Sequence, residues 1–179
     1  NEVVSYSPLD RKSAFNAAAL PQVVLGPPQA ENGGLSMGST GVVSLQAKVN
    51  NDGGRSAPYG GSITVKFSDN IVYDGPGSDF IVFENPLQVQ GSTSAYFIEP
   101  GIVEVSANGR DFFRFPFDFV PHFDQSGKLN LFNPSCYAQG FAGVHPVFSS
   151  NGFPDPTDPL KAGGDPFDLA NLPGRPLSW

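Results

Sequence analysis

Residues 73–85 read YDGPGSDFIVFEN, and this stretch decides how the chain is expected to fold. A Gly-Pro-Gly turn lies between Asp74 and Asp79, and the apolar run at 80–83 ends at Glu84. Turn residues followed by a run of Phe, Ile and Val predict a loop that leads into a β-strand. Because the run is apolar on both faces, we expect this strand to lie in the centre of its sheet. The acidic residues allow two interpretations, a loop that binds a cation or a polar connection without a ligand.

The composition of the whole chain also favours β-structure. The 179 residues include 21 Gly, 18 Pro and 16 Phe, and only 15% are charged. Short apolar segments interrupted by many turns are typical of an all-β protein, and residues 10–20 are the one stretch with helical character. The length suits one domain with a hydrophobic core and is short for two, so we predict a single domain over residues 1–179.

Two further segments carry clear strand patterns. Apolar and polar residues alternate in SITVKF at 62–67, which predicts a strand. In GIVEVSANGRDFFRFPF at 101–117, two apolar runs flank Asn108 and Gly109, a pair that accepts the positive φ angles of a tight turn. We therefore predict a β-hairpin there. The predicted core is drawn from these strands and comprises Val65, Phe67, Phe80, Val82, Phe83, Val103, Val105 and Phe115.

Charge, cysteine content and hydropathy argue against several classes of protein. The net charge of −7 opposes binding to a phosphate backbone, so nucleic acid is not an expected partner. The single Cys136 cannot form an internal disulfide, has no metal-site spacing, and is expected to be a small buried residue. No apolar run is long enough for a transmembrane segment. The first residue, Asn1, fits a removed secretory signal and equally a shortened chain.

No motif in the chain points to catalysis. His122 and His145 each stand beside a proline, and no nucleophile, zinc-protease, haem or phosphate-loop pattern occurs. Paired carboxylates for glycoside hydrolysis could come from Glu84, Glu99 or Glu104, but their spacing does not show that any two face each other. We therefore predict a protein that is not an enzyme.

Two acidic stretches are candidates for binding calcium, a cation that takes six to eight oxygen ligands and tolerates irregular loops. The stronger one, DPTDPLKAGGDPFDL, carries four aspartates with only Lys161 among them, and these carboxylates repel one another unless they are solvated or bridged. The predicted ligands are Asp155, Asp158, Asp165 and Asp168, with a second possible site at Asp74, Asp79 and Glu84. The alternative is that these aspartates cap turns, as is common in Asp-Pro and Asp-Gly sequences.

The order of motifs resembles a group of bacterial secreted or cell-surface domains, many of which carry C-terminal sorting tails. The resemblance covers nearly the whole chain and rests on VVSYSP, VVLGPP, GGSITVKFSDNIVYDGPGSDFIVFEN, FIEPGIVEVSANGRDFFRF, GFAGVHPVF and DPTDPLKAGGDPFDLANL. It implies an antiparallel β-sandwich of jelly-roll type that is exported and non-catalytic. The chain departs from the family pattern in the 46–59 insertion and after the FDLA block, where a further strand is replaced by NLPGRPLSW. An open sheet edge or a covering partner is the expected consequence.

These observations together predict a secreted, extracellular or cell-surface module, with the periplasm as an alternative, that is structural or binding in function and stabilised by calcium. A second hypothesis is a carbohydrate-binding module, because sugars stack on exposed aromatic rings; the candidate rings are Tyr59, Tyr73, Tyr96, Tyr137 and Trp179. A third is an accessory subunit that docks onto a protein partner through its Pro-rich tail. We expect the tail at 163–179 to be tied down, because its prolines lower the entropy lost on ordering.

Overall fold

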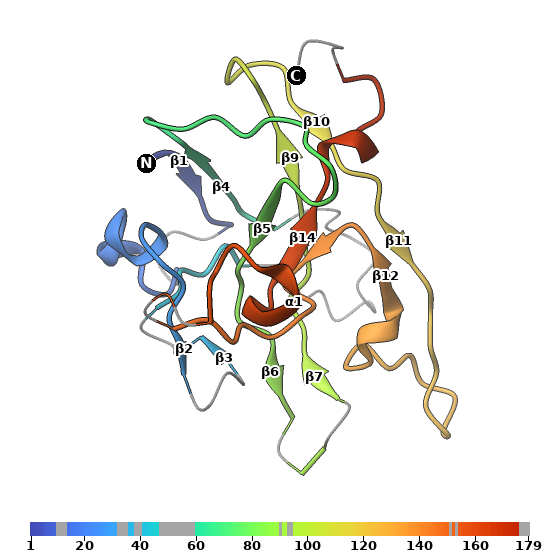
Figure 1. Ribbon diagram of the computed structural model, residues 1–179. Coiled ribbons are helices and arrows are strands. Elements are labelled where there is room, and N and C mark those ends of the chain that lie inside the picture. The colour runs from blue at the N-terminus through green and yellow to red at the C-terminus, as the bar shows by residue number, and fades with distance from the viewer. Residues whose placement is uncertain are drawn as a thin grey trace. The chain divides into compact units, whose positions relative to one another are not determined.

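The computed structural model describes residues 1–9, 14–31, 36–37, 41–46, 60–89, 91–92, 95–150, 152 and 154–175 (Figure 1). Strands make up 29% of the structure and helices 11%, which is consistent with the all-β prediction. In the part of the chain described, every sheet is a pair of strands. The chain divides into two compact units, a first unit of Asn1–Gly26 with Ser39–Ile71 and a second unit of Pro27–Gly38 with Val72–Trp179.

The first unit is built on one antiparallel pair. Strand β1 (Glu2–Ser7) pairs with β4 (Ser62–Lys66), which confirms the strand predicted from SITVKF. The predicted helical stretch at 10–20 gives the 3-10 turn η1 (Ala17–Ala19), and a second such turn, η2 (Gln22–Val24), follows it; residues 10–13 lie outside the described part. The 46–59 insertion lies outside it too, except Gln46.

Two predicted core residues of the first unit are not buried. Val65 and Phe67 are about half exposed, at 51% and 50%, so their assignment to the core was wrong. Alternation shows which side chains share a face of a strand, but it does not show whether a second layer covers that face.

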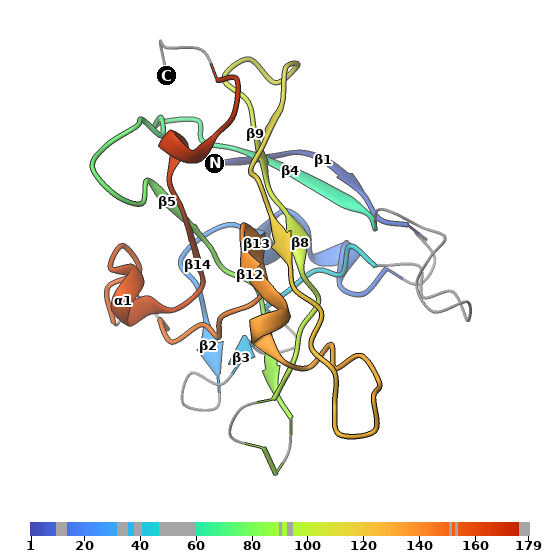
Figure 2. The ribbon, with the colours of Figure 1, turned by 90° about the vertical axis from the view of Figure 1, so that its right-hand side faces the viewer.

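The second unit contains the remaining elements, which are short. Their bounds are β2 (Ala30–Glu31), β3 (Ser36–Met37), β5 (Phe80–Val82), β6 (Leu87–Gln88), β7 (Tyr96–Phe97), β8 (Gly101–Ile102), β9 (Glu104–Val105), β10 (Phe113–Arg114), β11 (Asp118–Phe119), η3 (Pro134–Cys136), β12 (Tyr137–Gln139), β13 (Phe141–Ala142), α1 (Pro159–Ala162), β14 (Asp165–Phe167) and η4 (Leu169–Asn171). Neighbouring strands in the chain pair as β2 with β3, β6 with β7, and β9 with β10. More distant strands pair as β5 with β14, β8 with β13, and β11 with β12 (Figures 1 and 2).

The predicted hairpin is confirmed, with a wider loop than a tight turn. Strands β9 and β10 pair antiparallel, with Val105 opposite Phe113. In the loop, Gly109 has the positive φ of 69° that the sequence indicated, and the Asn108 side chain accepts hydrogen bonds from two backbone amides beyond it. The side chain of Asn108 therefore stabilises a loop of several residues.

The core of the second unit consists of two clusters. In the first, Phe167 stacks on Phe80 and meets Phe115 edge to face, at centroid distances of 5.4 and 4.9 Å. This cluster comprises Phe115, Ala142, Phe167, Leu169 and Leu172, with Phe80, Val82, Val103, Val105 and Phe113 packed against it. Phe115 is therefore buried as predicted, and the other predicted residues of this unit, including Phe83, are partly buried. The second cluster comprises Ile98, Cys136, Tyr137 and Val144, and Cys136 is a buried free thiol as expected.

Strand β5 is less central than its sequence suggests. It pairs antiparallel with β14, with Phe80 opposite Phe167 and Val82 opposite Asp165, and within the described residues it has this one partner. Beyond β14, Leu169 and Leu172 are buried, so this part of the tail is tied down; residues 176–179 lie outside the described part. No helix among the described residues is long and apolar enough to cross a membrane.

Candidate functional site

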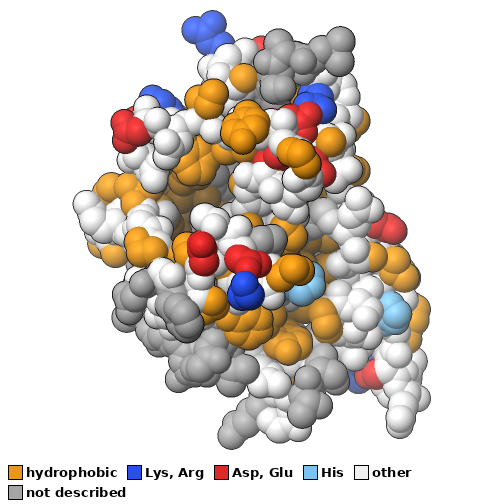
Figure 3. Space-filling view, viewed as in Figure 1, with side chains coloured by type: hydrophobic (Ala, Val, Ile, Leu, Met, Phe, Trp, Pro, Cys, Tyr) orange, Lys and Arg blue, Asp and Glu red, His pale blue; other side chains and the backbone are white. Residues whose placement is uncertain are grey.

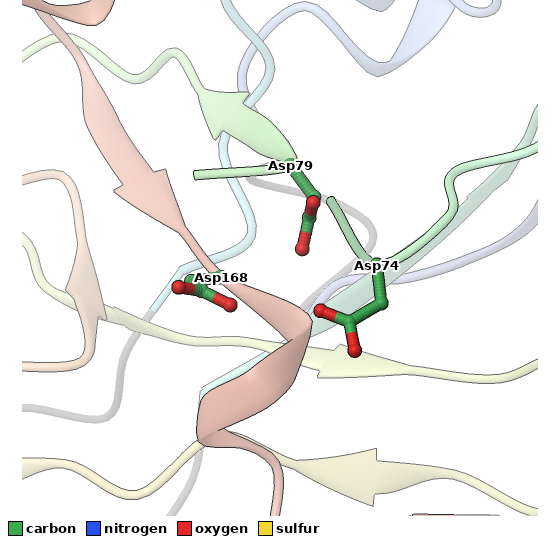
Figure 4. A group of neighbouring side chains, drawn as sticks. All are labelled: Asp74, Asp79 and Asp168. Carbon is green, nitrogen blue, oxygen red and sulfur yellow. The ribbon is translucent and has the colours of Figure 1, made fainter. Parts of the chain in front are cut away.

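The residues predicted to bind a metal fall in three places. Asp74, Asp79 and Asp168 come together, although Asp168 was predicted to belong to a different acidic stretch from the other two. The pairing of β5 with β14 explains this, because Asp79 immediately precedes one strand and Asp168 immediately follows the other. The three carboxylates point toward a shared gap, and one oxygen of each lies within 4.8 Å of the others (Figure 4). We call this group the acidic trio.

Hydrogen bonds hold the acidic trio in place. Asp79 accepts a hydrogen bond from the Gly75 amide at Oδ1 and another from the Leu169 amide at Oδ2, both at 2.7 Å. Asp168 caps η4 by accepting the Ala170 amide at 2.7 Å. One oxygen of Asp74 pairs with the Arg175 guanidinium, which offsets the charge of that carboxylate. Three carboxylates at this separation are a ligand set that a hard cation such as calcium accepts.

Asp155 and Asp158 act as turn caps at the surface. Asp155 accepts the backbone amide and the hydroxyl of Thr157, and these hydrogen bonds lower its pKa. Asp158 caps α1 through the Leu160 amide and pairs with Lys161, which lowers the pKa of Asp158. These contacts match the capping alternative considered from the sequence.

Asp165 is buried and holds the segment 143–145. Its Oδ2 accepts the amides of Gly143 and Val144 at 2.7 and 3.0 Å, and its Oδ1 accepts Nδ1–H of His145 at 2.7 Å. The hydrogen bond to Asp165 raises the pKa of His145, whose side chain is 66% exposed. The sequence singled out His145 but held no signal that would place it beside Asp165, because twenty residues separate them.

Glu84 has the most unusual environment of the acidic residues. Its Oε2 is buried and has no hydrogen-bond partner among the described residues. Burial raises the pKa of Glu84 to about 7; a hydrogen bond from the Asn85 backbone opposes the shift, and the charges of Glu99 and Asp165 add to it. Gly143 lies directly against this carboxyl group, since a Cβ on Gly143 would be 2.8 Å from Oε2.

A cavity of about 230 Å³ lies beside the His145–Asp165 pair. Its walls are Tyr137, Ala138, Gln139, Gly140, Phe141, Val144, His145, Asp165, Pro166 and Phe167. A histidine oriented by a buried aspartate can act as a base for a nucleophile. However, these walls contain no serine, threonine or cysteine that His145 could activate.

Large hydrophobic side chains are exposed along one stretch of the second unit. This exposed aromatic stretch comprises Phe112, Phe117, Phe119, Val120, Phe123, Leu129, Leu131 and Phe132, each between 39% and 64% exposed. Hydrophobic side chains reach the surface over the region of β11 and β12 in Figure 3. Of the rings considered for sugar binding, Tyr137 is buried and Tyr73 is exposed, while Tyr59 and Trp179 lie outside the described residues.

Comparisons of the chain with family models, with curated proteins and with solved structures find no match. The family resemblance of the sequence motifs therefore stays a prediction.

Proposed function

We propose that this chain is a non-catalytic extracellular module of a bacterial cell surface, structural or binding in role, whose fold is stabilised by calcium. The acidic trio carries the calcium part of the proposal. It joins the turn before β5 to the turn after β14, so a cation there would hold together segments about ninety residues apart. A jelly-roll arrangement of the strand pairs belongs to the same proposal, and the antiparallel pairing of the strands supports it.

The non-catalytic role is supported by how Asp79 and Asp165 are used. Asp79 and Asp165 each engage both oxygens in hydrogen bonds to backbone amides or to His145. Groups committed in this way stabilise turns and are poorly placed to exchange protons with a substrate. The cavity beside His145 also offers no hydroxyl or thiol nucleophile apart from the phenol of Tyr137.

The calcium proposal is tested by thermal unfolding in calcium and in chelator at equal ionic strength. A cation that binds only the folded state stabilises it by about 2.7 kcal/mol at a hundredfold excess over its dissociation constant. Asp168→Asn keeps the cap on Ala170, because Asn caps as well as Asp, but removes one charge from the trio. We expect this variant to lose most of the calcium-dependent rise in Tm.

Asp155→Asn is the matched control. Asp155 also accepts an amide two residues ahead, but it lies outside the trio. This variant should keep the full calcium response. Equal melting curves in calcium and chelator for the unaltered protein would reject the calcium site, and an equal loss in both variants would reject its location.

A binding role is favoured by the exposed aromatic stretch, which suits an apolar protein surface better than a glycan. Its rings are all Phe, which lacks the polar group that Tyr and Trp offer to a sugar. We expect no binding on a glycan array. Reproducible binding of one glycan class, lost on replacing Tyr73, would instead support the carbohydrate-binding hypothesis.

A further inference from the structure

Glu84 and the segment 143–145 are in direct contact. The backbone of Gly143 lies against the Glu84 carboxyl group, at a φ of 81° and with no room for a Cβ. The same segment is fixed from β14 by Asp165, which accepts the amides of Gly143 and Val144. One carboxyl group therefore binds this segment through hydrogen bonds, while the other, Glu84, packs against it with Oε2 unpartnered among the described residues.

The carboxylates around Glu84 disfavour a further negative charge there. Glu99, in the segment before β8, and Asp165, on β14, both act on Glu84 as like charges. The imidazole of His145, which carries a positive charge when protonated, is bound to the opposite oxygen of Asp165. An ionised Glu84 would be a buried charge without a hydrogen bond to Oε2, which is costly, whereas the protonated group removes that charge.

We propose that Glu84 is a proton-controlled latch, which when protonated lets the segment 143–145 pack closed and when ionised favours its release. The segment contributes Val144 and His145 to the wall of the 230 Å³ cavity, so release changes access to that cavity. The acidic trio shares no residue with this latch.

The direction of the pH effect follows from proton linkage. Glu84 has a pKa of about 7 in the closed, folded protein, against the ordinary glutamate value of 4.5, so the closed state binds more protons than the open one between these values. Closure is therefore fully favoured below about pH 4.5 and is lost as pH rises through 7. His145, whose pKa is also raised, acts in the same direction, because its contact with Asp165 weakens as it loses its proton.

The test is amide hydrogen exchange at Gly143 and Val144 between pH 5 and pH 8, read by NMR and divided by the intrinsic rates. Protection at these amides should fall by roughly 10²-fold as Glu84 ionises. In Glu84→Gln, which mimics the protonated side chain, the pH dependence should largely disappear. In His145→Asn, which cannot titrate, most of it should remain.

Two further measurements make the outcome decisive even if Glu84→Gln does not fold. The carboxyl carbon of Glu84 in the unaltered protein should titrate near neutral pH, and titration near 4.5 would overturn the latch. The Phe115 amide, which donates to Val103 in another part of the unit, serves as the reference. An equal loss of protection at Phe115 would mean global unfolding. Loss of the pH dependence in His145→Asn alone would identify the imidazole as the sensor, and either result contradicts the proposal.

Discussion

Asp79 shows how a single carboxylate can connect distant parts of this chain. Its two oxygens accept the amides of Gly75 and Leu169, the second of which is ninety positions away. Hydrogen bonds to a charged group contribute about 1.5–3 kcal/mol each, more than neutral ones. Asp79 thus joins the turn before β5 to the turn after β14, whether or not a cation binds beside it.

We expect Asp79→Ala to lower the free energy of unfolding by roughly 2–4 kcal/mol, because two amides lose their acceptor. Urea denaturation monitored by fluorescence measures this. Asp124→Ala is the control, since Asp124 accepts hydrogen bonds from nearby Ser126 and Lys128 in an exposed turn, and its loss should be smaller. A variant at Asp79 as stable as the unaltered protein would show that the long-range connection contributes nothing.

At the scale of elements, close backbone contacts at glycine fix how neighbouring strands are joined. Gly140 links β12 to β13 at a φ of 74°, and a Cβ there would lie 1.9 Å from the carbonyl oxygen of Pro116, between β10 and β11. Gly109, in the β9–β10 hairpin, has a similar φ of 69° but open space around it. Alanine substitutions at the two glycines therefore separate the free-energy cost of a positive φ, which both share, from the cost of a steric clash, which arises at Gly140 alone of the two.

Gly109→Ala should destabilise the protein by roughly 1–2 kcal/mol, the cost of placing a side chain in the left-handed region. Gly140→Ala should lose a further 1–3 kcal/mol or so, because the added methyl group also forces apart two packed segments. Chemical denaturation of both variants gives the comparison. Equal losses would mean that the backbone around Pro116 moves aside at no cost.

For the molecule as a whole, the sequence was informative about local structure and poor at long-range contacts. The strand at 62–67 and the hairpin at Asn108 follow from patterns within a few residues, and both are confirmed. The acidic trio depends on β5 pairing with β14, and no local pattern carries that information. Grouping aspartates by sequence proximity therefore placed Asp168 with Asp155, whereas the structure places it with Asp74 and Asp79.

Burial is also unevenly distributed between the two units. Among the described residues, the buried hydrophobic side chains all belong to the second unit, where they form both core clusters. The first unit contains the longest strand pair, β1 with β4, yet Val4 and Val65 on these strands are more than half exposed. Strand length and burial therefore favour different units as the more stable one.

We expect the second unit, which contains the buried side chains, to be the more stable one, because backbone hydrogen bonds contribute little net stability without apolar burial around them. Amides of β1 and β4 should then exchange roughly tenfold faster or more than those of β5 and β14, in hydrogen exchange read by mass spectrometry at one pH. Phe167→Ala, which removes a ring from the first core cluster, provides the control: it should speed exchange in β5 and β14 far more than in β1 and β4. Equal protection of both strand pairs, with an equal response to Phe167→Ala, would show instead that the two units open as one cooperative body.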